Sequence, residues 1–239
     1  MMDTKHPQTQ MRPRNLQNHP LPSSHVRVWD SPTRLFHWTI VSLVACSWYS
    51  ANSGLMKVHL WSGSLLLTLL LFRIAWGFLG STTARFSDFL HLPPRVIGYF
   101  KALMSDNKPL YAGHNPAGGL MVTALITVLL AQVATGLFSN DGIRFNGPLA
   151  LWVSTDISDR LTELHGILFN VIVLLVWMHL VAVFFYLFVK GENLLKPMVT
   201  GYKHRDHLPP QLNLKFVHWA IALAVLGVAA AVVGSILFL

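Results

Sequence analysis

The chain has 239 residues, of which 53% are hydrophobic and only 12% are charged, with eighteen Lys and Arg against ten Asp and Glu. Soluble domains carry about 25% charged residues, so this composition excludes an ordinary soluble enzyme and favours a membrane protein. The single cysteine, Cys46, excludes an intrachain disulfide, a cysteine-held iron–sulfur cluster and the paired cysteines of covalent c-type haem attachment.

The apolar residues gather in five blocks instead of amphipathic stripes. Each block is close to or above the ~17–25 residues that a spanning helix needs. The blocks cover residues 35–51, 58–79, 117–138, 161–189 and 214–239. The leader before the first block is longer than an ordinary signal-peptide n-region, so we expect that block to be retained. The pattern predicts an all-α membrane protein with five transmembrane helices.

The polar segments between these blocks define the remaining organisation. Residues 1–25 are rich in Gln, Asn, Pro and His, which predicts a disordered cytoplasmic tail. The connection at 80–116 contains a segment, Pro94 to Met104, that we expect to form a short interfacial helix. Residues 139–158 form the longest outer loop, and residues 190–213 form a second cytoplasmic connection.

The basic residues are distributed unevenly over the two sides of the membrane. When the connections are assigned to alternate sides, fifteen of the eighteen Lys and Arg residues fall on the side of the N-terminus. This is the positive-inside rule, and it predicts a cytoplasmic N-terminus and a periplasmic C-terminus. The basic excess therefore indicates topology and attraction to anionic membrane lipid, not nucleic-acid binding.

His165 and His179 are fourteen residues apart in the fourth block. Fourteen residues are about 40° short of four helical turns, so both imidazoles share one face, about 21 Å apart along the axis. That separation places one imidazole near each boundary of a hydrocarbon layer about 30 Å thick. A neutral imidazole is a good axial ligand for haem iron.

The alternating topology sorts the membrane histidines into two layers. His59 and His165 fall near the outer surface, and His37 and His179 fall near the inner surface. Each pair is expected to hold one non-covalent b-type haem with two axial imidazoles, inside a four-helix bundle. Such a closed iron passes electrons and has no site for oxygen. His218 is interpreted as an interfacial anchor, and His91, His114, His204 and His207 are assigned no role.

Four further residues are expected to contact the haems. Gly63 and Gly166 lack side chains beside His59 and His165, which allows a flat macrocycle to approach the helices, although glycine also serves ordinary helix packing. Arg73 lies on the same helix face as His59, one layer deeper. Two explanations for an arginine at this depth are equally good: it pairs with a haem propionate, or its side chain extends to the membrane interface. Arg34 is a similar candidate.

Several segments resemble the prokaryotic cytochrome b561 superfamily, which includes the b-type cytochrome subunits of nickel–iron hydrogenases. The resemblance covers about residues 26–202 and leaves 203–239 as a loop and an additional C-terminal helix. It implies a four-helix core with two b haems on His37, His59, His165 and His179. The similar segments are Arg34-Leu35-Phe36-His37-Trp38, His59 with Gly63, Arg73-Ile74-Ala75-Trp76-Gly77-Phe78, Ala84-Arg85-Phe86-Ser87-Asp88-Phe89, Gly113-His114-Asn115-Pro116, and Glu163-Leu164-His165-Gly166 with His179.

The resemblance implies electron exchange between the quinone pool and a redox partner, either a periplasmic c-type cytochrome or a hydrogenase-like subunit, in a bacterial inner membrane. Any enzymatic step would be quinone or quinol oxidoreduction, and a homodimer is left open. Two other functions are also left open. One is a transporter that uses intramembrane histidines for protons or a metal ion, which the absence of Asp and Glu from span interiors disfavours. The other is a membrane anchor whose haems are structural.

Overall fold

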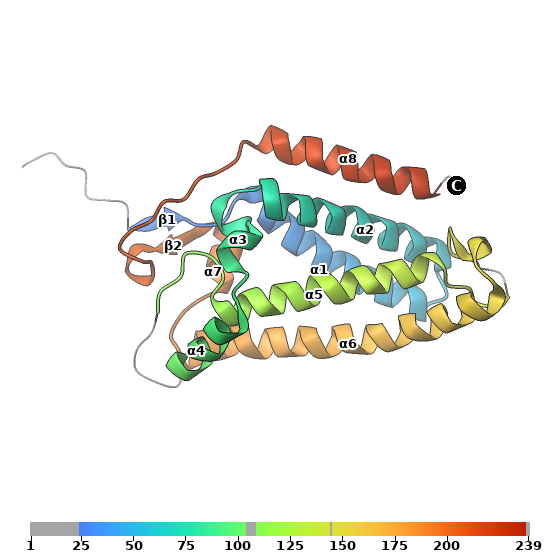
Figure 1. Cartoon of the computed structure of the whole chain (residues 1–239), viewed down its shortest axis with the longest axis horizontal. Coiled ribbons are helices and arrows are strands. Elements are labelled where there is room, and N and C mark those ends of the chain that lie inside the picture. The colour runs from blue at the N-terminus through green and yellow to red at the C-terminus, as the bar shows by residue number, and fades with distance from the viewer. Residues whose placement is uncertain (1–23, 104–108, 144, 238–239) are drawn as a thin grey trace, which may run out of the picture.

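Five long helices dominate the computed structural model, which describes residues 24–103, 109–143 and 145–237. These helices are α1 (Ser31–Asn52), α2 (Met56–Leu79), α5 (Pro116–Leu137), α6 (Thr155–Phe188) and α8 (Trp219–Leu237), and they run side by side (Figure 1). The short elements are β1 (His25–Arg27), η1 (Thr82–Ala84), α3 (Phe86–Phe89), α4 (Pro93–Leu103), η2 (Ala150–Trp152), α7 (Leu195–Thr200), β2 (Tyr202–His204) and η3 (Arg205–His207).

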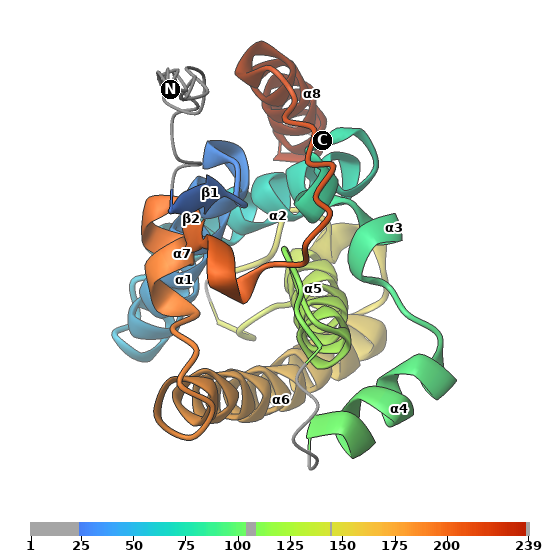
Figure 2. The same ribbon diagram turned by 90° about the vertical axis from the view of Figure 1, so that its left-hand side faces the viewer.

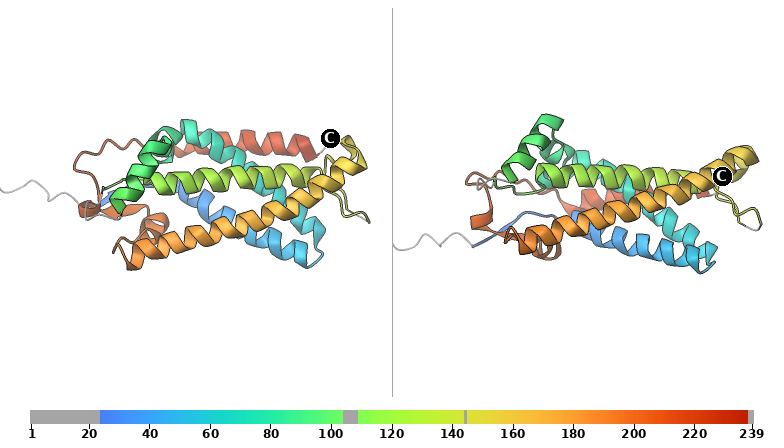
Figure 3. Two further views of the ribbon diagram at one scale, coloured as in Figure 1. Left: turned by 60° about the horizontal axis from the view of Figure 1, so that its bottom comes forward. Right: turned by 90° about the horizontal axis from the view of Figure 1, so that it is seen from below.

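The bundle has a simple order. Close backbone packing joins α1 to α2, α2 to α5, and α5 to α6, so neighbours in the chain are neighbours in space. Seen end-on, α8 lies on the far side of α2 from α6 (Figure 2). The views in Figure 3 show α1 and α2 as one hairpin and α5 and α6 as another. The long helices therefore form a four-helix core, with α8 added on one side.

Four of the five expected membrane spans are confirmed by length and composition. Within the described residues, α2, α5, α6 and α8 are long and apolar enough to cross a membrane. Helix α1 has 22 residues but is less apolar, because it carries several polar side chains. Ser42, Ser50 and Asn52 each donate a hydrogen bond to a backbone carbonyl of α1 itself. A crossing by α1 therefore stays a prediction.

Side chains fix where α1 and α5 begin. Asp30 caps α1 by accepting a hydrogen bond of 2.8 Å from the backbone N–H of Thr33. Its second carboxylate oxygen accepts from the indole N–H of Trp76 at 3.1 Å, which ties the start of α1 to the end of α2. Asn115 caps α5 in the same way, and Pro116 follows as a preferred first helical residue.

The short elements gather at one end of the bundle. Strands β1 and β2 pair antiparallel, with His25 opposite His204. The backbone N–H groups of Val28 and Trp29 both point to the carbonyl of Gly201, which has a left-handed φ of 90°. This end carries the segments expected on the cytoplasmic side, whereas the 139–154 loop and the end of α8 lie at the other (Figure 1).

Several expected boundaries shift in the structure. The predicted short helix at 94–104 is confirmed as α4, Pro93–Leu103, and residue 104 lies outside the described residues. Helix α6 begins at Thr155, six residues before its apolar block, because the helix continues into the polar outer loop. Helix α8 begins at Trp219, after an extended segment. Most of the predicted tail, residues 1–23, lies outside the description, but His25 belongs to β1.

Two glycines allow the connection after α2 to pack against the bundle. A Cβ at Gly77 would lie 2.1 Å from the Phe86 ring, and a Cβ at Gly119 would lie 2.2 Å from the carbonyl oxygen of Phe89. Both distances are far below van der Waals contact. The absence of side chains at Gly77 and Gly119 therefore holds the two phenylalanines of α3 against α2 and α5.

We predict that Gly119→Ala destabilises the protein, because the new methyl group would clash with the backbone carbonyl of Phe89, which can move away only if the whole of α3 moves. Overpacking of this kind costs about 1–3 kcal/mol, which thermal unfolding in detergent would register as a lower Tm. Gly98→Ala is the matched control, since no atom lies within 4 Å of a Cβ built there. Equal Tm values for the two variants would contradict the proposed packing role.

Candidate functional site

The structure brings His59 of α2 and His165 of α6 together. Their ring centroids lie 6.1 Å apart. The Nδ1 atom of His59 lies 2.9 Å from the carbonyl oxygen of Ser47, and Nδ1 of His165 lies 2.8 Å from that of Gln132. A carbonyl only accepts, so Nδ1 carries the hydrogen in each ring and Nε2 keeps the lone pair. This is the arrangement that orients a metal-binding imidazole.

A second pair, His37 of α1 and His179 of α6, lies fourteen residues further along α6. The ring centroids are 6.5 Å apart. Nδ1 of His37 is buried and has no hydrogen-bond partner among the described residues. The side chains of all four histidines are half-buried. Helix α6 therefore contributes one imidazole to each of two levels, and α1 and α2 contribute the opposing ones.

The spacing within each pair is compatible with one metal ion between the rings. A metal–imidazole nitrogen bond is about 2 Å long, so two imidazoles on opposite sides of an ion have centroids roughly 6 Å apart. Both pairs lie close to that value. The described residues contain no group of three or more His, Cys, Asp or Glu that could hold a metal ion. Two opposing imidazoles without further protein ligands suit a planar macrocycle that supplies the remaining ligands itself.

Three glycines lie beside the outer pair. A Cβ built at Gly63 or Gly166 would have no atom within 4 Å, so both positions face open space. Gly136 of α5 is different, because its Cβ would lie 2.9 Å from Cε1 of His165. Thus Gly136 makes room for the His165 ring itself, and sequence reasoning had not identified it.

Arg73 is buried at the inner end of α2, with 2% of its surface exposed. Its guanidinium lies against the rings of Phe86 and Phe89, at 5.4 and 5.6 Å from their centroids. No carboxylate among the described residues lies within ion-pair distance of it, and its Nη1 has no partner. A buried guanidinium without an ion pair is costly, so an anionic group bound at this end of the bundle would stabilise it.

Arg34 differs from Arg73 in its surroundings. Its Nη1 donates to the carbonyl of Val199 at the end of α7, and its Nη2 lies 3.3 Å from the Ser31 hydroxyl. Only its Nε is buried without a partner. These contacts give Arg34 hydrogen-bond partners, whereas Nη1 of Arg73 has none among the described residues.

Comparison with protein families identifies the chain. The sequence profile described as prokaryotic cytochrome b561 matches residues 28–201, which is most of the chain and the whole of α1 to α7. The chain belongs to the prokaryotic cytochrome b561 family. No curated protein matches it significantly.

The family and the four apolar helices identify the chain as a multi-pass membrane protein that transfers electrons through b-type haem. The residues fit that cofactor on structural grounds. The imidazoles oppose one another in pairs, the Nδ1 atoms of the outer pair are held by carbonyls, and Gly63 and Gly166 face open space. Helix α8 lies outside the matched residues of this cytochrome.

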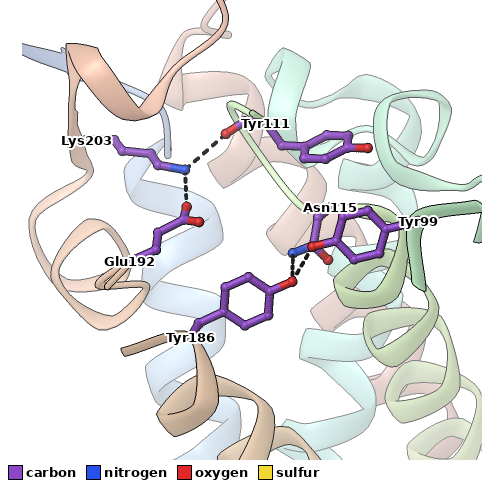
Figure 4. Close-up of polar contacts among 6 residues, drawn as sticks. All are labelled: Tyr99, Tyr111, Asn115, Tyr186, Glu192 and Lys203. Carbon is purple, nitrogen blue, oxygen red and sulfur yellow. Dashed lines mark hydrogen bonds and ion pairs between the residues drawn. The ribbon is translucent and has the colours of Figure 1, made fainter. Parts of the chain in front are cut away.

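A cavity of about 170 Å³ lies at the inner end of the cytochrome, between α4, the start of α5 and the end of α6. Figure 4 shows the hydrogen bonds around it. The Tyr186 hydroxyl accepts from the Asn115 amide at 3.1 Å and is hydrogen-bonded to the Tyr99 hydroxyl. On the other side, Nζ of Lys203 donates to Glu192 at 2.6 Å and to the carbonyl of Tyr111 at 3.1 Å.

The phenols of this cavity remain protonated at neutral pH. Burial, followed by the hydrogen bond to Tyr186, raises the pKa of Tyr99, and burial also raises the pKa of Tyr111. Tyr186 lies seven residues after His179, which is about two turns, so the cavity is one step from the inner histidine pair. Sequence reasoning missed this cluster, because its members come from separate segments and share no motif.

We predict that Gly136→Ala reduces haem occupancy in this cytochrome, because the added methyl group would displace the His165 ring from the Gln132 carbonyl. Absorbance of the purified protein and its haem content would measure the effect. Gly234→Ala in α8 is the control, since its Cβ would meet nothing within 4 Å. Unchanged haem content and spectrum in Gly136→Ala would contradict the role of this glycine.

Proposed function

We propose that the chain is a di-haem b-type cytochrome that carries electrons across a bacterial inner membrane between the quinone pool and a redox partner protein. The observation that carries this proposal is that two histidines of α6 each face a histidine of another helix, at two separate levels. The ligands would be His59 with His165 at the outer level and His37 with His179 at the inner level. When bound, each haem would supply a reversible one-electron change at its iron.

The chain's own residues would orient and hold these groups. The carbonyls of Ser47 and Gln132 would keep the outer imidazoles turned toward the iron and raise their basicity. The bare backbones of Gly63 and Gly166 would admit the macrocycle. Arg73 would pair with an inner propionate, and Arg34, with its buried Nε, is the second candidate for such a contact.

The proposed topology has five crossings, with α1 as the first and α8 as the last. It places the N-terminus in the cytoplasm and the C-terminus in the periplasm. Support comes from the positive-inside distribution of the basic residues. The polar side chains of α1 do not oppose a crossing, because their hydrogen bonds go to the helix backbone.

The cavity at the inner end is the proposed site for the quinol headgroup. It is lined by hydroxyl, amide and ammonium groups that can bind quinone oxygens, and a cavity of about 150 Å³ is enough for benzene. Exposed apolar side chains at and just before the adjoining α4, Leu92, Ile97 and Phe100, offer a surface for a prenyl tail. The protein partner, a periplasmic c-type cytochrome or a hydrogenase-like subunit, would then exchange electrons at the outer level.

The purified protein is expected to contain two haems per chain in a pyridine haemochrome assay. Replacing His59 or His165 by Ala should remove one component of the reduced-minus-oxidised spectrum, and replacing His37 or His179 should remove the other. The reason is that each substitution would remove one of the two imidazoles that would hold that haem, and the haem would then be bound far less tightly.

His207→Ala, at the edge of the inner cavity, serves as the control and should keep both components. A content of one haem per chain would overturn the two-level arrangement. Loss of the same component on replacing His59 and His179 would overturn the pairing.

Tyr186→Phe is expected to raise the KM for a short-chain quinol several-fold, with haem content unchanged. The substitution removes the hydroxyl that joins Tyr99 and Asn115. Stopped-flow reduction of the haem by quinol would measure it, with Tyr49→Phe, an exposed tyrosine at the other end, as control. If Tyr186→Phe leaves KM unaltered, the quinol site lies elsewhere.

A further inference from the structure

Two buried polar groups beside the inner histidine pair have no partner among the described residues: Nη1 of Arg73 and Nδ1 of His114. They come from different segments and lie on the same aromatic ring. The guanidinium carbon is 5.6 Å from the centroid of Phe89, and the His114 ring is 5.1 Å from it. The ring of Trp29, 4.7 Å away, also packs against His114. Two unsatisfied polar groups around one phenylalanine require a common explanation.

His114 is neutral at physiological pH. Burial, then the positive charge of Arg73, then His179 and His37, lower its pKa to about 3. A neutral imidazole has one N–H to donate, and a guanidinium has only donors. The next residue, Asn115, donates to the hydroxyl of Tyr186, two turns after His179 on α6, so His114 lies at the same end of the bundle as the inner pair.

The surroundings of this donor pair favour an anion. Helix α5 begins two residues after His114, and the N-terminus of a 22-residue helix carries partial positive charge. Neither nearby carboxylate forms an ion pair with Arg73 among the described residues. Asp30 accepts from Thr33 and from Trp76, and Asp88 lies beside Gly113, where its Oδ2 is 3.1 Å from the position of a Cβ. The chain therefore presents two donors and a helix N-terminus, and leaves the acceptor to be supplied by a bound molecule.

We propose that Arg73 and His114 jointly bind one carboxylate of the inner haem and thereby raise its midpoint potential relative to a haem without this contact. This inference rests on the proposed di-haem function. Reduction adds one negative charge to the haem, so a nearby guanidinium and an N–H donor stabilise the reduced form more than the oxidised form. Arg73 and His114 act as positioning residues through the carboxylate and do not touch the iron.

The first experiment is an optical redox titration of the purified holoprotein. Arg73→Gln and His114→Leu should each lower the potential of the inner haem and leave that of the outer haem unchanged. Both should also speed transfer of the inner haem to excess apomyoglobin several-fold. The conservative variants Arg73→Lys and His114→Gln retain a donor and should recover most of both effects.

Arg85→Gln is the matched control, because Arg85 lies at the same end but its Nε already donates to the carbonyl of Gly80 at 2.7 Å. A second experiment changes the cofactor instead of the protein. Apoprotein reconstituted with haem dimethyl ester, which lacks free carboxylates, should lose its inner haem to apomyoglobin equally fast in the wild type and in Arg73→Gln. The reason is that the carboxylate contact removed by the substitution is already absent.

The outcomes separate this inference from the function on which it rests. Protein without haem would overturn the proposed function. Protein with two haems whose potentials are the same in wild type, Arg73→Gln and His114→Leu would overturn only the carboxylate contact. An equal fall in both haem potentials, or faster loss of the ester haem from Arg73→Gln than from the wild type, would also overturn it, because neither follows from a contact with one carboxylate.

Discussion

The structure depends on one constraint: a polar group within an apolar bundle must find a partner inside the protein. Most polar side chains of the long helices meet it locally, by donating to carbonyls of their own helix, as Thr68 and Thr123 do. The imidazoles of His59 and His165 meet it across helices, through the carbonyls of Ser47 and Gln132. A few buried groups do not meet it among the described residues, including Nη1 of Arg73 and Nδ1 of His37 and His114.

The sequence was sufficient for features that depend on a regular period or on mean apolarity. Four spans, the short helix α4 and the juxtaposition of the histidines at two levels follow from helical geometry and an alternating topology. Helix α1 shows where this reasoning weakens, because its serines and Asn52 reduce its apolarity although its backbone continues as a helix. The start of α6 at Thr155 could not be predicted either, since the polar residues of its first turns are equally typical of a loop.

The features that sequence reasoning missed are all tertiary. Gly136 looks like any small residue in an apolar helix until the His165 ring is seen against it. His114 lies in a connecting segment, where a histidine is usually solvated, and the packing of Trp29 and Phe89 on its ring shows why its Nδ1 is buried. The cluster of Tyr99, Asn115 and Tyr186 joins three separate elements. No period or motif links residues that meet only through the fold, so contacts of this kind require coordinates.

The two levels of the bundle differ in their electrostatics, and the difference bears on the direction of electron flow. Around the outer pair, the described contacts to the imidazoles come from neutral groups, the carbonyls of Ser47 and Gln132 and the Thr135 hydroxyl. The inner level holds the buried cation Arg73 and lies next to the N-terminus of α5. Positive potential favours the state with the additional electron. Under the proposed function, an electron is therefore more stable on the inner haem than on the outer haem. Transfer from the outer to the inner level then lowers the free energy. Transfer in the opposite direction requires an electron donor that is reducing enough to overcome that difference.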